Sequence, residues 1–178
     1  MKVTIVFLGW QNMERIKKGI ILFLLLIGTA YCFGEQISFQ IVQLNNSAEN
    51  VTEEAKVVED FLIDSFFDAG YIVTNSEAAL AKSRAEYPKL WQTGMNEAIA
   101  GYSDYFVQVI LQFTETLDET INKNVMILKN VDFSVYRTEN LEELSKQNLP
   151  CNLKILNPSD MGTISDSLIF EINKVINA

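Results

Sequence analysis

Acidic side chains are the residues whose spacing along this chain could do chemistry. Asp60, Asp64 and Asp68 recur at every fourth position, which places them on neighbouring turns of one helix face. Like charges at that spacing repel, and a hard cation such as Ca²⁺ or Mg²⁺ would relieve the repulsion. One helix rarely supplies enough ligands alone, and no EF-hand spacing is present. We therefore expect a solvated helix face and predict no metal site and no cofactor.

A second group of acids, Glu115, Asp118 and Glu119, stands between two strand-like segments. The simplest interpretation is a soluble loop. A hydrolase that uses paired carboxylates would need two acids about 5–10 Å apart in a cleft. Because sequence cannot establish such a distance, a carboxylate-based hydrolase remains an alternative function.

The chain contains no histidine. This removes the commonest general base, the usual Ser and Cys triads, and most zinc and haem sites. The two cysteines are Cys32 and Cys151. Cys151 has no histidine to activate it, so we expect a small buried residue rather than a nucleophile. These exclusions predict a protein that binds other molecules and is not an enzyme.

Residues 1–34 predict an export signal. A basic stretch from Met13 to Lys18 leads into an apolar run of about 13 residues, the length of a signal-peptide core and short of the roughly 20 needed to span a bilayer. Cys32 and Gly34 stand at the −3 and −1 positions before Glu35, so we expect cleavage after Gly34. Met13 offers a more conventional start than Met1.

Two rival interpretations of this segment stay open. The first is a lipoprotein acylated on Cys32, although the preceding residues resemble a lipobox poorly. The second is an uncleaved anchor. In each case the bases before the apolar run hold the N-terminus in the cytoplasm and send the domain outward. We expect a periplasmic or otherwise exported protein of the bacterial envelope.

The charge of the remaining chain limits its partners. Residues 1–34 carry four bases and one acid, which leaves ten bases and twenty-two acids, a net charge of −12. Such a domain repels phosphate backbones and anionic lipid surfaces. We expect no nucleic-acid partner and no membrane insertion of the mature domain, apart from a lipid at Cys32.

Alternation, caps and turn residues predict the element order β-α-β-α-β-β-β-α. The fold class is α+β, with one mixed sheet of about five strands, helices packed on it, and a single domain spanning residues 35–178. The expected segments are a strand at 37–44, a helix from the Thr52 cap to Ala69 before Gly70, a strand at 71–74, a helical stretch from Ser76 that breaks near Pro88 and ends at Gly101, strands at 105–113 and 125–136 around a loop at 116–123, an irregular or briefly helical segment at 138–150, a strand at 151–156, and a helix opened by Asn157.

Four apolar or aromatic residues are candidates for partner binding. At 100° per residue, the first helix should turn Val58, Phe61, Leu62, Phe66 and Ala69 toward the sheet. Ile63 and Phe67 then lie away from that stripe, where either residues 77–99 cover them or they form an exposed docking pair. Tyr87 and Trp91 flank the break at Pro88 and fit either a partner anchor or the core.

Three segments resemble bacterial envelope modules of the TolB amino-terminal type, a group that includes the curli secretion protein CsgG and lipoprotein activators of penicillin-binding proteins. Residues 59–73 resemble the helix-to-strand step of those modules, 98–107 their entry into a long hairpin, and 163–172 their closing helix. Residues 138–149 depart from the pattern, because the family has a Gly turn there. The resemblance implies a non-enzymatic envelope module that docks onto other proteins in the assembly or regulation of an envelope structure.

A carrier of a small apolar ligand is a further alternative. The Phe-rich first helix and the 48% hydrophobic composition suggest it. A closed apolar cavity of several hundred Å³ would favour it.

Overall fold

The computed structural model describes residues 34–118 and 122–178 of the chain. The export segment through residue 33, with Cys32, and the loop acid Glu119 lie outside the described residues. Residues Glu35–Ala178 form one compact unit, and all that follows concerns that unit.

The elements follow the predicted order. They are β1 (Gln36–Leu44), α2 (Glu53–Asp68), β2 (Ile72–Ala81), η1 (Arg84–Glu86), α3 (Tyr87–Ala100), β3 (Tyr105–Asp118), β4 (Lys123–Arg137), β5 (Glu142–Ile155), η2 (Pro158–Met161) and α4 (Gly162–Ile176), where η1 and η2 are 3₁₀ turns. The five strands form one sheet in the order β2-β1-β3-β4-β5. β1 runs parallel to β2 and β3, and β3, β4 and β5 form an antiparallel meander. This confirms the α+β class and the mixed sheet.

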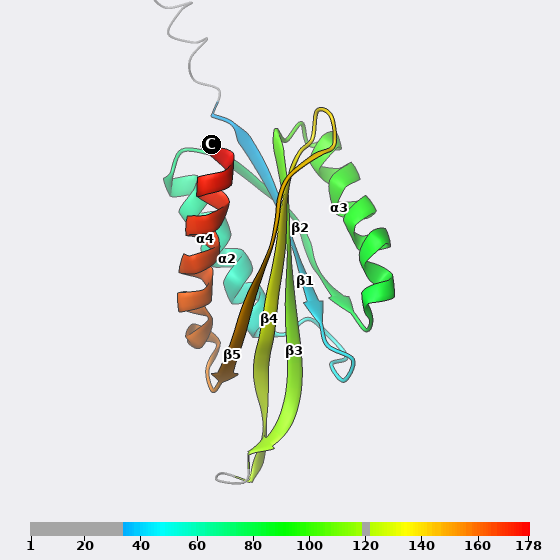
Figure 1. Ribbon diagram of the computed structural model, residues 1–178, viewed down its shortest axis with the longest axis vertical. Coiled ribbons are helices and arrows are strands. Elements are labelled where there is room, and N and C mark those ends of the chain that lie inside the picture. The colour runs from blue at the N-terminus through cyan, green and yellow to red at the C-terminus, as the bar shows by residue number, and fades with distance from the viewer. Residues whose placement is uncertain (1–33, 119–121) are drawn as a thin grey trace, which may run out of the picture. The chain divides into compact units, whose positions relative to one another are not determined.

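Helices cover both faces of the sheet. α2 and α4 lie on one face and α3 lies on the other (Figure 1). Strand β1 is buried along almost its whole length, because helices cover it on both sides. A strand that is buried on both faces can carry apolar residues on both. The alternation of apolar and polar residues that predicted this strand is therefore not required for it.

The main core lies between the sheet and the α2/α4 pair. Helix α2 contributes Ala55, Val58, Leu62 and Phe66, all fully buried, at the spacing of one helix face. The Phe66 ring packs against Phe39 of β1, with ring centroids 5.1 Å apart.

Two members of the predicted apolar stripe on α2 do not face the sheet, and here the prediction is wrong. Phe61 is 41% exposed, and its ring lies toward Gly162 at the start of α4. Ala69 is exposed because it follows the last helical residue as the C-cap. Gly70 ends the helix as predicted, with a φ of +94°, a conformation that favours glycine.

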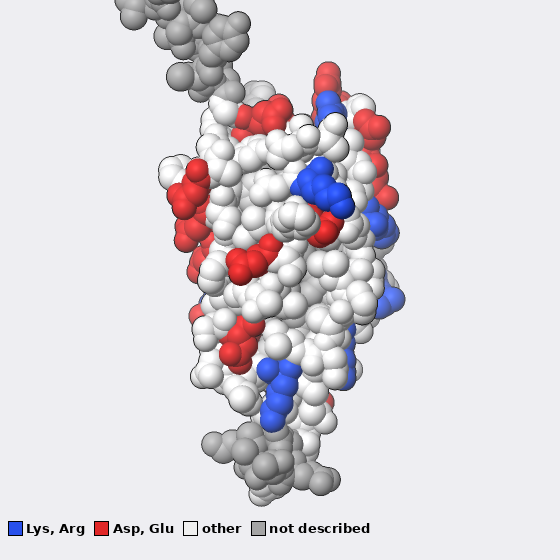
Figure 2. Space-filling model, turned by 60° about the vertical axis from the view of Figure 1, so that its left-hand side comes forward, with Lys and Arg blue, Asp and Glu red and all other residues white. Residues whose placement is uncertain are grey.

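The outer face of α2 is acidic. The helix carries six acids, and Lys56 is its single base, paired with Glu53 at 2.8 Å. Figure 2, which brings the α2/α4 side forward, shows acids at the left edge, at the top and across the middle of the view, with bases in the middle and at the right margin.

Residues 72–81 form a strand, and the predicted helical stretch from Ser76 is wrong. Ser76 is buried in β2, which pairs in parallel with β1. Pairing with a neighbouring strand outweighs the weak helical preference of the local Glu-Ala-Ala sequence. Only the part of the predicted helix after the break survives, as α3, with Pro88 in its first turn and Gly101 as its C-cap.

Residues 142–150 belong to strand β5, so the prediction of an irregular or briefly helical segment there is wrong. β5 pairs with β4 across most of its length. It is an edge strand, and edge strands tolerate charges and proline such as Pro150. The predicted loop at 116–123 is also shorter than expected, because β3 continues to Asp118 and β4 begins at Lys123.

Asn157 opens the last helical segment as predicted, because it caps the 3₁₀ turn η2, which leads directly into α4. The Asp160 carboxylate accepts hydrogen bonds from the backbone N–H groups of Leu156 (2.9 Å) and Asn157 (3.0 Å). Those N–H groups lower the pKa of Asp160. In residues 34–118 and 122–178, no helix combines the length and the apolar character that crossing a membrane requires.

Candidate functional site: a groove beside helix α3

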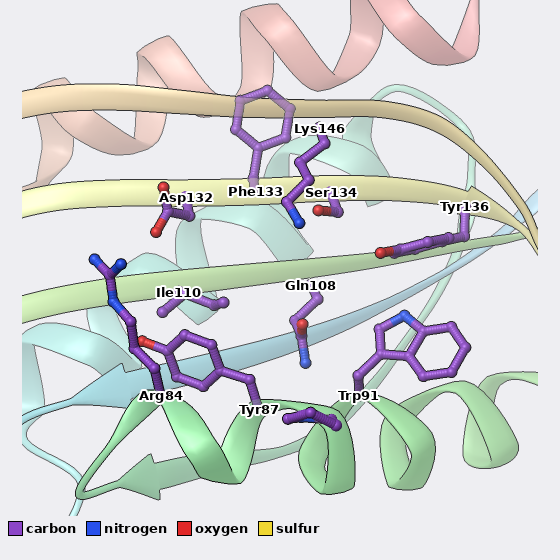
Figure 3. Close-up of a pocket in the computed structure, with 11 residues that line it drawn as sticks. Arg84, Tyr87, Trp91, Gln108, Ile110, Asp132, Phe133, Ser134, Tyr136 and Lys146 are labelled. Carbon is purple, nitrogen blue, oxygen red and sulfur yellow. The ribbon is translucent and has the colours of Figure 1, made fainter.

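A groove of about 440 Å³ opens between α3 and the exposed face of the sheet. α3 packs against β2, β1 and β3. The same face of β4 and β5 extends beyond the helix. The groove is lined by Arg84, Tyr87, Pro88, Trp91, Gln108, Ile110, Asp132, Phe133, Ser134, Tyr136 and Lys146. Figure 3 shows that the Phe133 side chain points away from the groove, toward the other face of the sheet.

A glycine lets α3 lie close to the sheet. A Cβ atom on Gly94 would stand 2.8 Å from the Gln40 side chain and 2.8 Å from the Phe106 ring. Real Cβ atoms do not approach that closely. The small core beneath α3 contains Met95, Ala98 and Phe106. This contact holds one wall of the groove in place.

The strand register places a row of polar side chains on the groove floor. Gln108 of β3 lies opposite Ser134 of β4, which lies opposite Lys146 of β5. The amide of Gln108 donates to Gln40 Oε1 at 2.8 Å, and both side chains are almost fully buried. Asp132 Oδ1 accepts hydrogen bonds from the amides of Asn130 (3.1 Å) and Asn148. The floor of the groove is thus a row of polar side chains on one face of the sheet.

Aromatic rings form the end of the groove beside α3. The Trp91 ring meets Tyr136 edge-on at 5.5 Å, and Tyr136 stacks on Phe106 at 6.2 Å. The Tyr136 hydroxyl donates to Glu143 Oε2 at 3.0 Å. Burial raises the pKa of Tyr136. These rings pair a large apolar area with few rotatable bonds, a property of binding surfaces.

Two polar atoms on α3 are shielded from water without a hydrogen-bond partner among the described residues. They are the hydroxyl of Tyr87 and the indole nitrogen of Trp91. Burial raises the pKa of Tyr87 to about 12, while nearby Arg84 partly offsets the rise. The Trp91 indole lies near enough to Tyr136 to lower the pKa of that phenol, but makes no hydrogen bond of normal geometry with it. Buried polar atoms are usually paired, but Gln43, Asn45, Thr52 and Ser76 also have such atoms elsewhere among the described residues, so this property does not by itself mark the groove.

Two cations flank the groove. Arg84 donates from Nη2 to Gln112 Oε1 at 3.1 Å. The Lys146 ammonium points into the groove (Figure 3). In the part of the chain that the structure describes, the Lys146 side chain forms neither an ion pair nor a hydrogen bond. The groove therefore holds local positive charge within an acidic unit.

The structure brings together only two of the four predicted partner-binding residues. Tyr87 and Trp91 lie one turn apart on α3 and both line the groove. Ile63 is half-buried and Phe67 is 68% exposed on α2, across the sheet. The alternative that residues 77–99 cover Ile63 and Phe67 is wrong, because α3 lies on the opposite face (Figure 1). Partner binding by any of the four stays a prediction.

The sequence did not single out Gln108, Asp132, Ser134 or Lys146. The polar residues of β3 and β4 do alternate with apolar ones, which signals a strand with one polar face. The position of Lys146 on the groove floor could not be predicted, because residues 142–150 were not predicted to be a strand.

The acidic groups and the remaining candidates lie elsewhere. Asp60 and Asp64 border a small exposed hollow on α2, and Glu115 is exposed on β3. Across the described ranges, no group of three His, Cys, Asp or Glu side chains could hold a metal ion. Of the processing residues, Gly34 and Glu35 begin the described chain, and cleavage before Glu35 stays a prediction.

Cys151 is half-buried on β5 rather than fully buried. Its thiol donates to the Leu128 carbonyl at 3.5 Å. Burial raises the pKa of the thiol, which lowers the thiolate fraction and with it the reactivity.

A protein-family model whose description is "Uncharacterised protein" matches residues 36–166. The chain belongs to that family. A search of curated proteins found no match.

Several solved structures are similar to the chain at low identity. The PelC dodecamer from Paraburkholderia phytofirmans matches at 11% identity with a TM-score of 0.45, covering 76% of this chain and 87% of that one. A lipoprotein from Neisseria meningitidis matches at 13% identity with a TM-score of 0.43, covering 80% and 99%. TolB from Acinetobacter baumannii matches at 15% identity with a TM-score of 0.41, covering 80% of this chain but 28% of TolB.

Proposed function

We propose that this member of the family is an exported, non-catalytic binding module of the bacterial envelope, and that it holds a protein partner in the groove beside α3. The observation that carries the proposal is the groove of about 440 Å³ whose wall is built from the aromatic side chains of Tyr87, Trp91 and Tyr136. Such rings offer a large, rigid contact area to a partner. The predicted export signal supports the location.

The residue types of the groove suit recognition better than chemistry. Tyr, Trp and Arg are the side chains most enriched at the energetic centres of interfaces. Asp132 is the one acid among the residues that line the groove, and two amide donors hold it. A paired-carboxylate hydrolase would need a second acid across the cleft.

The test compares two aromatic residues on opposite faces. The full chain, tagged at its C-terminus, is expressed behind its own leader as wild type, Trp91→Ala and Phe170→Ala. Phe170 is 67% exposed on α4 and serves as the matched control. Envelope proteins that co-purify are quantified by mass spectrometry, and thermal melts verify that both variants fold.

We expect Trp91→Ala to lose about tenfold or more of a specific co-purifying protein, as truncating an interface anchor costs 2 kcal/mol or more. Phe170→Ala should retain it. Equal capture by all three proteins would contradict the proposal.

A carrier of a small ligand is the second candidate. The volume of the groove, about 440 Å³, lies within the usual range for ligand sites, but the groove is open and has a polar floor, unlike the closed apolar cavity that an apolar ligand would favour. Native mass spectrometry of the protein purified from its host would show a bound small molecule as a discrete mass increment, lost in Trp91→Ala.

A further inference from the structure

We infer that the end of the sheet where β1 begins rests on a lipid bilayer, to which the leader, residues 1–33, keeps the chain attached. This inference goes beyond the proposed function and concerns a different surface. It comes from the side chains that are exposed at that end and from the place where the leader joins it.

The topology brings many element ends to this one surface. β1, β2 and β3 run parallel, so all three begin there. The helices α2 and α3 each connect two of these strands and therefore end there as well. β4 runs the opposite way and ends there, and β5 begins there. We name this surface the entry end; it consists of residues 34–36, 70–72, 99–104 and 137–142 (Figure 1).

The leader joins the entry end in its interior. β1 has a neighbouring strand on each side. The backbone N–H of Gln36 donates to Asp104 Oδ2 at 2.8 Å, and the Gln36 amide donates to the Gly101 carbonyl at 2.6 Å. On the other side, the N–H of Ile72 donates to the Glu35 carbonyl at 3.0 Å. The chain therefore enters the described unit between two loops of this surface and not at its margin.

Apolar side chains gather around the point of entry. Of the nine large apolar side chains that are exposed among the described residues, four belong to the entry end: Ile72, Ile99, Tyr102 and Leu141. Tyr102 is 88% exposed and Leu141 is 52% exposed. Their loops lie side by side, because the N–H of Thr138 donates to the Asp104 carbonyl at 3.0 Å. Exposed apolar side chains that gather in this way mark an interaction surface.

The backbone holds two of these side chains outward at a cost. Tyr102 has a φ of +61° and Leu141 a φ of +59°, a region that favours glycine and that bulky residues rarely adopt. Gly101 stands directly before Tyr102, yet the tyrosine takes the left-handed position. Strained positions persist where the structure around them requires them, and they gather at functional sites. The strain here indicates that these two exposed side chains are in use.

The sequence before Glu35 identifies what the entry end meets. Cys32 is three residues away, and three residues span at most about 11 Å. A lipid on Cys32, or retention of the apolar run that ends at Tyr31, therefore brings a bilayer within reach of the entry end. Tyrosine prefers the boundary between lipid and water. One acyl chain gives only marginal membrane binding, so a second contact of this kind stabilises the attachment.

Charge selects the kind of lipid surface. Glu35, Asp104 and Glu139 line a small hollow at the entry end together with Arg137. The hollow carries more negative than positive charge, which opposes contact with anionic headgroups. A zwitterionic headgroup carries no net charge and fits this surface. Phosphatidylcholine vesicles are therefore the probe.

The first measurement asks whether the chain stays attached. The full chain is expressed behind its own leader, and the intact mass of the exported form is determined. We expect it in the membrane fraction, with a mass that shows either diacylglycerol plus an acyl chain on Cys32 or the uncleaved leader. The two masses distinguish the two forms of attachment, and both support the inference. A released chain that begins at Glu35 would overturn it.

The second measurement asks which surface touches the lipid. Benzoylphenylalanine replaces Tyr102, Leu141 or Phe170 in the full chain. Phe170, 67% exposed on α4, is the matched control. Each purified protein is reconstituted into phosphatidylcholine vesicles that carry a radioactive label in the choline headgroup, and is irradiated. A lipid attached to Cys32 in the cell does not contain this label. We expect labelled protein from positions 102 and 141 and none from position 170.

Equal labelling at all three positions would overturn the inference, because the chain would then be attached without a preferred face. Absence of label at positions 102 and 141 would overturn it too, as would a crosslink to a second protein there in place of lipid. None of these outcomes bears on the groove. Capture that depends on Trp91 tests the proposed function separately.

Discussion

The two faces of the sheet are built differently, although the same strands form both. The α2/α4 face buries a continuous cluster of twenty apolar residues, whereas the buried cluster under α3 contains three. Two helices cover the sheet on the α2/α4 face. On the other face, α3 is the one helix among the described residues, and it leaves β4 and β5 uncovered (Figure 1). The α2/α4 face supplies the stability, which leaves the α3 face free to keep polar and unpaired side chains.

The largest expected effect comes from breaking the larger core. Phe66→Ala should destabilise the protein by about 3–5 kcal/mol, the usual cost of removing a fully buried aromatic side chain. Met95→Ala on the other face should cost about 2 kcal/mol, at the low end of its range, because the small core beside the groove can relax. Urea denaturation compares the two. A larger loss for Met95→Ala would reverse the roles that we assign to the faces.

Gly94 should give the next effect. Gly94→Ala forces a Cβ against Gln40 and Phe106, and such overpacking costs about 1–3 kcal/mol. The better helix propensity of alanine, about 1 kcal/mol, offsets part of that cost. We expect a net loss together with a shift in Trp91 fluorescence, because α3 must move away from the sheet. A gain in stability would mean that the close approach of α3 is not required.

Alkaline pH should act on the α3 face through Tyr87. Burial raises its pKa in the folded protein to about 12, above the value of about 10 for an unfolded chain. The stabilising contribution is therefore complete below about pH 10 and is lost as the pH rises toward 12. Tyr87→Phe should show a smaller fall in melting temperature between pH 9 and about pH 11 than the wild type. Identical falls would place the titration elsewhere, for example at Tyr136.

The smallest effect on stability is expected at Phe67. Phe67→Ser should leave the melting temperature within about a degree, since exposed substitutions usually cost under 0.5 kcal/mol. If Phe67 is part of a second interface, the same change weakens self-association, measured by sedimentation. An unchanged sedimentation profile would remove α2 from the candidate surfaces.

Local signals predicted the elements that depend on local contacts. Gly70 and Gly101 marked the helix ends, and Asn157 with Pro158 marked the entry to α4, because caps depend on a few neighbouring residues. The predictions for residues 76–81 and 142–150 were wrong, because each segment becomes a strand by pairing with another part of the chain. Such pairing is invisible to local propensity.

The candidate site was predictable only in part for the same reason. Tyr87 and Trp91 were singled out as aromatic residues beside Pro88, but their shared face was not predicted, because a break was expected between them and the structure has a continuous helix from Tyr87. Gln108, Ser134 and Lys146 meet through the register of three strands, which no local pattern reveals. The position of α3 above them depends on Gly94, whose role appears only when the sheet is in place.

Site-directed photocrosslinking in living cells tests the contrast between the faces most directly. Benzoylphenylalanine would replace Ile110, which lines the groove on the α3 face, in one strain and Phe170 on the α2/α4 face in another, each in the full chain with its own leader. This leaves the proposed anchor Trp91 in place. We predict a discrete crosslinked product at position 110 and none at position 170. A product at Phe170 alone would contradict the assignment of the groove as the partner-binding site.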